Sequence, residues 1–395
     1  WPPSVSPQWS SPSRMGASPI PTDEAEKETV ILEKDSQDTE TTQSVLDLAA
    51  SIEALDEAAM EQARARQQVL TKPAGSLGRL EDLAVQIAGI TRQVTPVIER
   101  KAVIVMTGDH GVTAEGVSAY PSAVTTQMVL NFLHGGAAIN ALARQQGAHV
   151  VVVDIGVAAD LHSPDLVERK VAYGTANMAS GPAMTRAQMV QAIETGRAVF
   201  EEQRKTEGIE MVATGEMGIG NTTASSAITA AILQLPVAQV TGRGTGLDDK
   251  QLTHKIGVIE RALAVNAPDA HDPLDVLMKV GGLEIAGLVG VILAAAARRV
   301  PVVIDGFIAG AAALIAVELN DKVAGYLIAG HTSVEQGHAL ILTRLGLRPL
   351  LNLGLRLGEG TGAVLAMGII EGALHTHREM LTFAEAGVST RTDEA

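Results

Sequence analysis

The chain has 395 residues, of which 46% are apolar and 2% aromatic, and it carries a net charge of −15. A chain of this length and apolar content can bury a sizeable core, whereas the scarcity of aromatic rings and the negative charge argue against a nucleic-acid partner. The absence of cysteine excludes disulfides, thiol nucleophiles and thiolate metal sites and fits a cytoplasmic protein. The longest apolar run, 285–297, is too short to span a bilayer, so we expect no membrane partner.

Residues 1–45 are rich in Pro, Ser, Thr and acidic residues, which predicts a disordered tail with no part in the chemistry. From 46 to 99 the apolar residues recur at helical spacing, with a turn-rich joint at 72–78. From 100 to 370 short β-branched runs alternate with helical stretches. These runs predict strands over 102–107, 150–154, 211–213, 300–305, 323–329 and 350–353. Because the runs are continuously apolar, we predict an α/β fold with a Rossmann-like parallel sheet and helices on both faces.

Three glycine-rich turns follow predicted strands, at 214–223, 241–249 and 358–362. Glycine lets the backbone approach a ligand closely, and the N-terminus of the following helix favours an anion. The dipeptide Gly-Lys is absent, so there is no Walker loop, and no dinucleotide fingerprint stands in its proper place. Each turn alone could be a tight connection, but together they indicate a phosphosugar site. An NAD-binding Rossmann oxidoreductase is the alternative.

Two further clusters have both ordinary and functional interpretations. Asp109 and His110 follow the first predicted strand, either as a capping Asp and a surface His or as a pocket wall. His331, Glu335 and His338 would share one face of a helix, which is the basis of a second alternative, a metal-dependent hydrolase. HExxH is absent and a glycine interrupts the stretch, so we favour structural hydrogen bonding and expect no metal.

Taken together, these segments resemble the nicotinate-nucleotide:5,6-dimethylbenzimidazole phosphoribosyltransferase family of cobalamin lower-ligand synthesis. The resemblance covers about residues 46–380. Its matching text is "KPAGSLGRLEDLA" (72–84), "GDHGV" (108–112), "VSAYPSAVTTQMVLNFLHGGAAINALAR" (117–144), "TGEMGIGNTTASSAI" (214–228), "GRGTGLDD" (242–249), "DGFIAGAAAL" (305–314), "AGHTSVEQGH" (329–338) and "LNLGLRLGEGTGAVLAM" (351–367).

The resemblance implies transfer of phosphoribose from nicotinate mononucleotide to a benzimidazole, giving α-ribazole 5′-phosphate and nicotinate. It also implies a homodimer, no metal or other cofactor, and a smaller helical domain built from 46–99 and a C-terminal helix within 371–395. The general base falls on Glu359 and a second active-site acid on Glu216. Residues matched to phosphate and ribose binding are Gly218, Gly220, Asn221, Thr222, Gly242, Arg243, Gly244, Lys255, Asp305 and Gly306.

The implied benzimidazole pocket consists of Tyr120, Pro121, Gln127, Met128 and Leu357. Tyr-Pro stands where the best-known members have Ser-Pro, and Met128 stands where they have Gln. The preferred base is therefore left open among dimethylbenzimidazole, adenine and phenolic acceptors.

The transfer reaction needs a general base, and a carboxylate between glycines is suited to that role. The pyridinium of the nucleotide leaves without an acid. The incoming ring nitrogen carries, or is tautomerically tied to, an N–H whose proton must be lost, so one base is the main catalytic demand. Two other turns, with Arg243 and Lys255, account for the phosphate. We therefore interpret Gly358, Gly360 and Gly362 as giving a flat heterocycle close access, and we expect Glu216 to act at the ribose or nicotinate end.

Overall fold

The computed structural model describes residues 1, 3–6, 8, 42–244 and 246–390. Within this part of the chain, six parallel strands form one sheet in the order β3-β2-β1-β4-β5-β6. The strands are β1 (Lys101–Gly108), β2 (Ala148–Gly156), β3 (Leu166–Glu168), β4 (Met211–Met217), β5 (Val302–Ile304) and β6 (Leu327–Ala329). The strand order reverses between β1 and β4, where a doubly wound sheet binds its ligand. The predicted α/β fold is confirmed.

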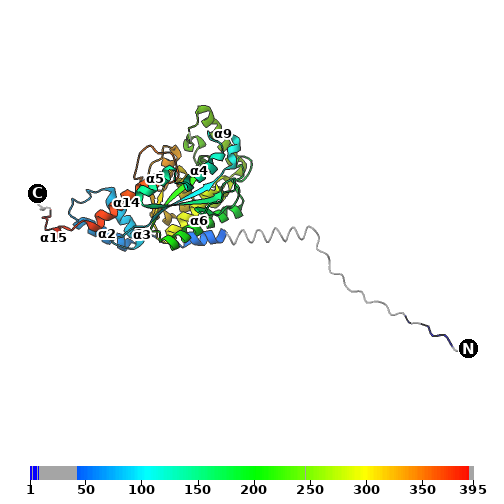
Figure 1. Cartoon of the computed structure of the whole chain (residues 1–395), viewed down its shortest axis with the longest axis horizontal. Helices are drawn as coiled ribbons and strands as arrows, with labels where there is room; N and C mark the ends of the chain where they lie inside the picture. The colour runs from blue at the N-terminus through cyan, green and yellow to red at the C-terminus, as the bar shows by residue number, and fades with distance from the viewer. Residues whose placement is uncertain (2, 7, 9–41, 245, 391–395) are drawn as a thin grey trace.

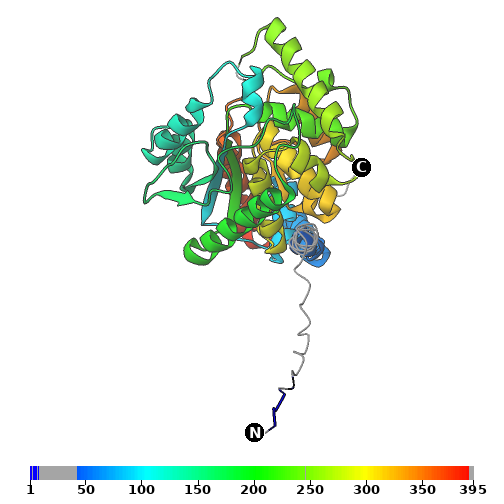
Figure 2. The same cartoon turned by 90° about the vertical axis from the view of Figure 1, so that its right-hand side faces the viewer.

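Alternate residues of the central strand face opposite layers of helices. Ala102, Ile104 and Met106 of β1 belong to one buried cluster, and Val103 and Val105 belong to the other. Every β1 residue is buried because helices cover both faces, as Figure 2 shows. The continuous apolar run that predicted this strand is the consequence of that double burial.

The first layer contains the helices that pack on the Ile104 side of the sheet. They are α6 (Arg186–Glu207), α7 (Asn221–Leu233), α8 (Val237–Val240), α9 (Asp249–Asn266), α10 (Pro273–Val280), α11 (Leu283–Ala297), α12 (Phe307–Leu319) and α13 (Gln336–Arg344). The second layer contains α3 (Arg79–Thr91), α4 (Ala123–Leu133), α5 (Ala138–Gln146) and α14 (Thr361–Glu379). None of the described helices is both long and apolar enough to cross a membrane.

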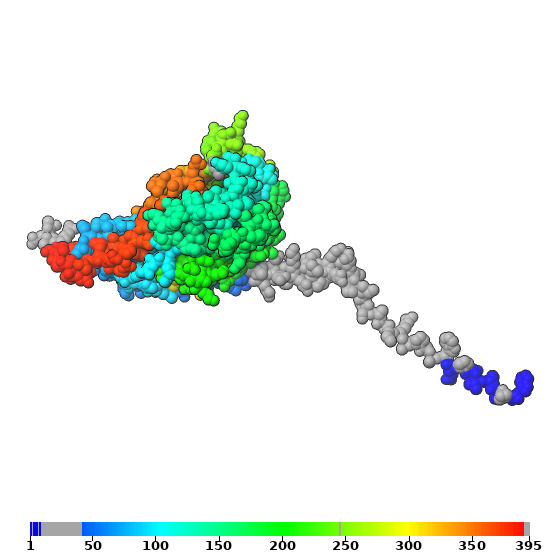
Figure 3. All heavy atoms as spheres, viewed as in Figure 1, coloured from blue at the N-terminus to red at the C-terminus, as the bar shows by residue number. Residues whose placement is uncertain are grey.

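Segments 57–70 and 377–386, far apart in the sequence, meet beyond one end of the sheet. There α2 (Glu57–Val69) lies beside the end of α14 and α15 (Phe383–Ala386), as Figures 1 and 3 show. Leu70 and Thr382 form an antiparallel bridge, and Arg66 donates to the carbonyls of His377 and Arg378 at 2.8 and 2.9 Å. The predicted border at residue 370 falls inside α14, so this helix links the site to the helical end. The division into domains stays a prediction.

Several predicted elements differ from those observed. Most of the predicted tail lies outside the described residues, but 42–50 are helical and Val45 is fully buried. The strand predicted over 323–329 is a 3₁₀ helix, η2 (Asp321–Tyr326), followed by the short β6. Residues 350–353 form no strand, only an isolated bridge from Leu351 to His331. β3 was not predicted, because its three residues are too few to show a pattern.

Candidate active site

A cavity of about 360 Å³ lies at the carboxyl ends of β4, β5 and β6. One part of its wall is apolar, formed by Val124, Met128, Ile219, Phe307, Ile308 and Leu357 with Tyr120. The polar part is formed by Glu216, Asn221, Thr222, His331, Ser333, Glu335, Arg356 and Glu359. An apolar wall with a few convergent polar groups is typical of a small-molecule site.

Glu216 is the penultimate residue of β4 and its side chain enters the cavity. The strand continues to Met217 instead of ending at residue 213 as predicted, so Glu216 pairs in register with Met106 of β1. Burial raises the pKa of the Glu216 carboxyl well above its ordinary value, and the nearby Asp305 and Glu284 carboxylates add to this shift. The side-chain amide of Asn221 donates a hydrogen bond to Glu216, which lowers the pKa and so opposes this shift. Glu216 is thereby suited to donating a hydrogen bond as a neutral acid.

Glu359 lies between Gly358 and Gly360, just before α14. Its own φ is +63°, a left-handed conformation that is strained for a residue with a side chain. Its Oε2 accepts a 3.2 Å hydrogen bond from Ile139 N in the first turn of α5. Burial raises the pKa of Glu359, the Ile139 hydrogen bond opposes that rise, and the charge of Asp305 adds to it. A buried carboxylate with a raised pKa is a suitable general base near neutral pH.

The glycines around Glu359 make room for protein groups, and their role in giving a flat heterocycle access stays a prediction. A Cβ at Gly358 would collide with Oε1 of Glu216, and one at Gly360 would lie 2.7 Å from Cγ2 of Val103. A Cβ at Gly362 would collide with the ring of His331. The turn is therefore pressed against the strands and against two site residues, and only Gly358 of the three also lines the cavity.

The basic groups of the site gather where the loop after α8 meets α7 and α9. The Lys255 ammonium is buried behind Thr222 and donates to its Oγ1 at 2.7 Å. Burial lowers the pKa of Lys255 to about 8, against the opposing charge of Glu335. Oε1 of Glu335 accepts from Gly244 N at 2.9 Å, and Arg356 donates to Gly244 O at 3.3 Å. Arg356 lines the cavity, and Lys255 lies behind Thr222 of its wall. Together with the N-terminus of α7 they are groups that suit an anion.

Arg243 points away from these groups. Its guanidinium pairs with Asp249 and donates to Leu247 O at 2.9 Å, and half of its side chain is exposed. Of the turn Gly242-Arg243-Gly244, only Gly244 lines the cavity. Gly242 instead packs against Glu335, whose carboxylate would collide with a Cβ there. No pattern in the sequence indicated that Arg356, 112 residues further on, lies beside Gly244.

The other sequence-predicted site residues divide into two groups. Those that line the cavity are Gly218, Asn221, Thr222, Gly306, Tyr120, Met128 and Leu357. Those that are not among its described lining residues are Gly220, Lys255, Asp305, Pro121 and Gln127. Val124 was missed although it lies one turn before Met128 on α4, a spacing that the sequence shows. Asp305 is buried behind the cavity, where its Oδ1 accepts from Gly362 N and Ala363 N at 2.7 and 3.0 Å.

The three residues of the hydrolase alternative do not share a helical face. His331 follows β6, Glu335 caps α13, and only His338 lies within that helix. Nδ1 of His338 accepts from Ser333 N at 3.0 Å, and burial lowers its pKa to about 3. Among the described residues, no group of three or more His, Asp or Glu side chains could hold a metal ion. The structural interpretation of these residues fits better than the hydrolase.

His110 is buried and does not belong to the surface, contrary to the ordinary interpretation of its motif. Its Nε2 lies 2.6 Å from Oε1 of Glu284, at the start of α11. Burial disfavours the charged ring, but the Glu284 carboxylate outweighs it and raises the pKa of His110. The backbone after β1 enters a 3₁₀ helix, η1 (Gly111–Glu115), and carries no dinucleotide loop. The NAD alternative therefore has no support in this part of the fold.

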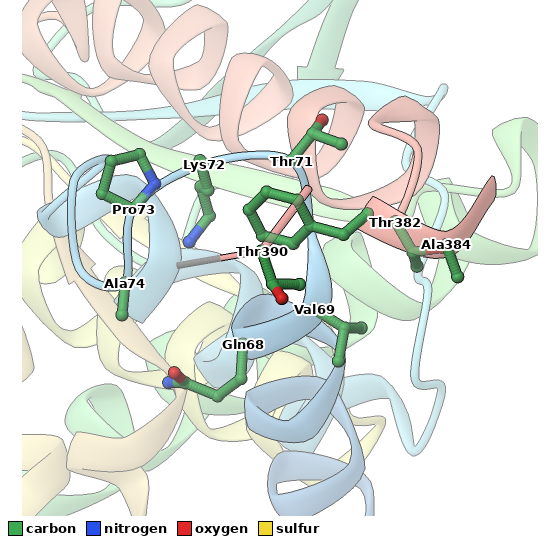
Figure 4. Close-up of a pocket in the computed structure, with 10 residues that line it drawn as sticks. Gln68, Val69, Thr71, Lys72, Pro73, Ala74, Thr382, Ala384 and Thr390 are labelled. Carbon is green, nitrogen blue, oxygen red and sulfur yellow. The ribbon is translucent and has the colours of Figure 1, made fainter. Parts of the chain in front are cut away.

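A second hollow, of about 1160 Å³, lies between the end of α2 and α15 (Figure 4). It is lined by Gln68, Val69, Thr71, Lys72, Pro73, Ala74, Thr382, Phe383, Ala384 and Thr390. The Lys72 ammonium is already engaged with Glu81 at 2.8 Å. This hollow contains none of the paired acids and basic groups of the first cavity, so we assign the chemistry to the cavity at the sheet.

Comparison with known proteins agrees with this site. A family model described as phosphoribosyltransferase matches residues 52–388. The nicotinate-nucleotide–dimethylbenzimidazole phosphoribosyltransferase of Chloroflexus aggregans is 62% identical over 340 residues, covering 86% of this chain and 96% of its own. The enzyme of that name from Desulforudis audaxviator is 59% identical over 336 residues, covering 85% and 95%. This chain belongs to the phosphoribosyltransferase family.

The solved structures agree with the family in fold. The crystal structure of CobT from Thermus thermophilus is 48% identical to this chain and superposes with a TM-score of 0.81, covering 84% of this chain and 99% of that one. As a phosphoribosyltransferase the protein must hold a phosphate, a ribose and an acceptor. The wall of the cavity includes the basic Arg356, the acids Glu216 and Glu359, and apolar side chains such as Met128.

Proposed function

We propose that this phosphoribosyltransferase transfers phosphoribose from nicotinate mononucleotide to 5,6-dimethylbenzimidazole or a related base, in cobalamin nucleotide-loop assembly. The observation that carries the proposal is that Glu359 and Glu216 line one cavity together with Arg356 and several apolar side chains. An apolar wall fits a flat aromatic acceptor, and Lys255 and Arg356 fit the 5′-phosphate. The relatives with the same printed activity support the choice of substrates.

In the proposed reaction the bond between C1′ and the nicotinate nitrogen breaks, and its electron pair returns to the pyridine ring. Positive charge develops at C1′ as in glycoside cleavage, and the benzimidazole nitrogen attacks from the opposite face with inversion. The attacking nitrogen is the one without a hydrogen, and Glu359 takes the proton from the N–H nitrogen of the same acceptor ring, a contribution of about 10²- to 10⁴-fold. Glu216, as a neutral acid, donates a hydrogen bond to an oxygen of the ribose or of the nicotinate.

The proposed activity is tested by product identification. The protein is incubated with nicotinate mononucleotide and, separately, dimethylbenzimidazole, adenine or a phenol, and the products are identified by mass. We expect α-ribazole 5′-phosphate and nicotinate in equal amounts with dimethylbenzimidazole. Release of nicotinate without any acceptor product would indicate a hydrolase and contradict the proposal. The homodimer and the cytoplasmic location stay predictions.

We expect Arg356, and not Arg243, to contact the phosphate. Arg356→Gln is expected to raise the KM for nicotinate mononucleotide roughly tenfold, the size of one charged hydrogen bond, and to leave the KM for the acceptor unchanged. Arg243→Gln removes a guanidinium of the same size that faces Asp249 at the surface. Steady-state kinetics with each substrate varied would separate the two. If Arg243→Gln raised the KM for nicotinate mononucleotide more than Arg356→Gln, the phosphate contact would belong to Arg243, as predicted from the sequence.

A further inference from the structure

His331 occupies a space that two glycines leave open. It follows β6, is 2% exposed, and its ring lies between Gly306 at the end of β5 and Gly362 in the first turn of α14. A Cβ at Gly306 would lie 3.4 Å from Nε2 of His331, and one at Gly362 would collide with the ring. The imidazole is therefore packed directly against the helix turn that begins two residues after Glu359.

Asp305, the residue directly after β5, caps the N-terminus of α14 from outside that helix. The residue at the N-cap position, Gly360, supplies no side chain, and Oδ1 of Asp305 accepts the Gly362 and Ala363 N–H groups instead. These are two of the four N–H groups that the start of a helix leaves without partners. Nε2 of His331 lies 3.5 Å from the same oxygen. In the described part of the chain, His331 is the basic side chain within ion-pair distance of Asp305.

The backbone at Glu359 needs this support. A left-handed conformation at a residue with a side chain costs on the order of 1–3 kcal/mol and persists only where the surroundings fix it. On the helix side, Thr361 donates to Gly358 O, and the Asp305 hydrogen bonds follow three and four residues after Glu359. The strand side is fixed by the hydrogen bond from Glu359 N to Glu216 O at 3.3 Å.

The charged groups around His331 come from each element packed on it. Asp305 faces it from the end of β5, and His338 faces it from α13 with ring centroids 6.0 Å apart. His338 is neutral, with a pKa of about 3, while Asp305 raises the pKa of His331 against the effect of burial. Asp305 in turn raises the pKa of both Glu359 and Glu216. When the His331 ring is protonated, its charge offsets the carboxylate that acts on both site acids.

We propose that His331 is a positioning residue for Glu359: it holds Asp305 against the first turn of α14 and neutralises the Asp305 charge behind the base. This rests on the proposed role of Glu359. His331 acts through Asp305, so its effect should vanish when Asp305 is neutral. The proposal distinguishes His331 from the hydrogen-bonded His338 beside it, which carries no charge.

The two single variants are expected to move the pH profile in opposite directions. His331→Gln leaves the Asp305 charge without its counter-charge, so the acidic limb of kcat/KM should move to higher pH. Asp305→Asn removes the charge that raises the pKa of Glu359, so the limb should move to lower pH. Both variants should lower kcat about tenfold to a hundredfold, because a misplaced reacting group costs that much, with little change in the KM for nicotinate mononucleotide.

The double variant tests whether His331 acts on Glu359 through Asp305. Adding His331→Gln to Asp305→Asn should produce no further shift of the limb, a non-additivity expected when two residues act as one unit. His377→Gln is the matched control, because His377 is also buried on α14 but contacts Gln67 and Val94 O at its far end. It should lower the thermal midpoint without moving the limb.

Several results would overturn the proposal. In one, the acidic limb of kcat/KM in His331→Gln stays where it is in the wild type; in another, it shifts in the same direction as in Asp305→Asn. Either result would show that His331 does not neutralise the charge of Asp305. A raised KM with an unmoved limb would make His331 a direct substrate contact. If His331→Gln does not fold by circular dichroism, an NMR titration of the His331 ring decides: its pKa should fall in Asp305→Asn, and an unchanged pKa would refute the pairing. The acidic limb must also be absent in Glu359→Gln. If it persists there, Glu359 is not the general base, and the pairing of His331 with Asp305 is not refuted by that result.

Discussion

Glu359→Gln is expected to lower kcat at least a hundredfold, within the range of about 10²- to 10⁴-fold that a general base contributes. The amide oxygen can still accept from Ile139 N, and the backbone strain at φ +63° is unchanged because glutamine has a similar side chain. The KM for nicotinate mononucleotide should change little, because Glu359 is proposed to act on the acceptor and the groups proposed to bind the phosphate are unchanged. Single-turnover measurements with nicotinate mononucleotide and dimethylbenzimidazole would give the chemical step directly.

The stability of this variant separates a lost base from a lost fold. The folded-state pKa of Glu359 is raised, so the protonated form stabilises the fold at low pH and that contribution is lost as pH rises through the folded pKa. At neutral pH the ionised carboxylate therefore costs stability, and Glu359→Gln should unfold at a temperature no lower than the wild type. Glu371→Gln, which breaks the ion pair of α14 with Lys101, is a control that should keep its turnover. Turnover of Glu359→Gln near that of the wild type would refute the assignment.

Much of the fold could be predicted because the signals are local. Strands such as β1 and β2 are covered on both faces, so their apolar runs stand out in the sequence. β6 has three residues and its neighbour at 350–353 makes only one bridge, so neither length nor composition separates a strand from an extended loop there. Glycine turns were predicted at each of the three places, although the first begins only after Met217. What each glycine makes room for depends on residues far away in the sequence.

In the candidate site, too, contacts between residues far apart in the sequence could not be predicted. The acids Glu216 and Glu359 were found by their motifs, and the cavity contains both. The direction of Arg243 could not be predicted, because a side chain in a turn follows its tertiary partners, here Asp249 and Leu247 O. Glu335 and Arg356 reach Gly244 from segments about 90 and 110 residues further along the chain, a proximity created only by folding.

Lys255→Met is expected to raise the KM for nicotinate mononucleotide about tenfold to a hundredfold, since one buried charged hydrogen bond to the phosphate is lost. Methionine keeps an apolar stem of similar length in a site that is 1% exposed, so the surrounding packing should persist. Lys279→Met, which removes an ammonium from the ion pair with Asp275 on α10, is the matched control and should leave both KM values unchanged.

The pH dependence of the wild type gives an independent test of the same contact. With a pKa of about 8 in the free protein, Lys255 loses its charge above that pH, and the KM for nicotinate mononucleotide should then rise. A bound phosphate dianion would hold the proton on Lys255, so kcat at saturating substrate should stay level across the same range. The KM for dimethylbenzimidazole should not follow this rise. In Lys255→Met the alkaline rise should be absent; if it persists, or if both KM values rise together in the wild type, Lys255 does not bind the phosphate.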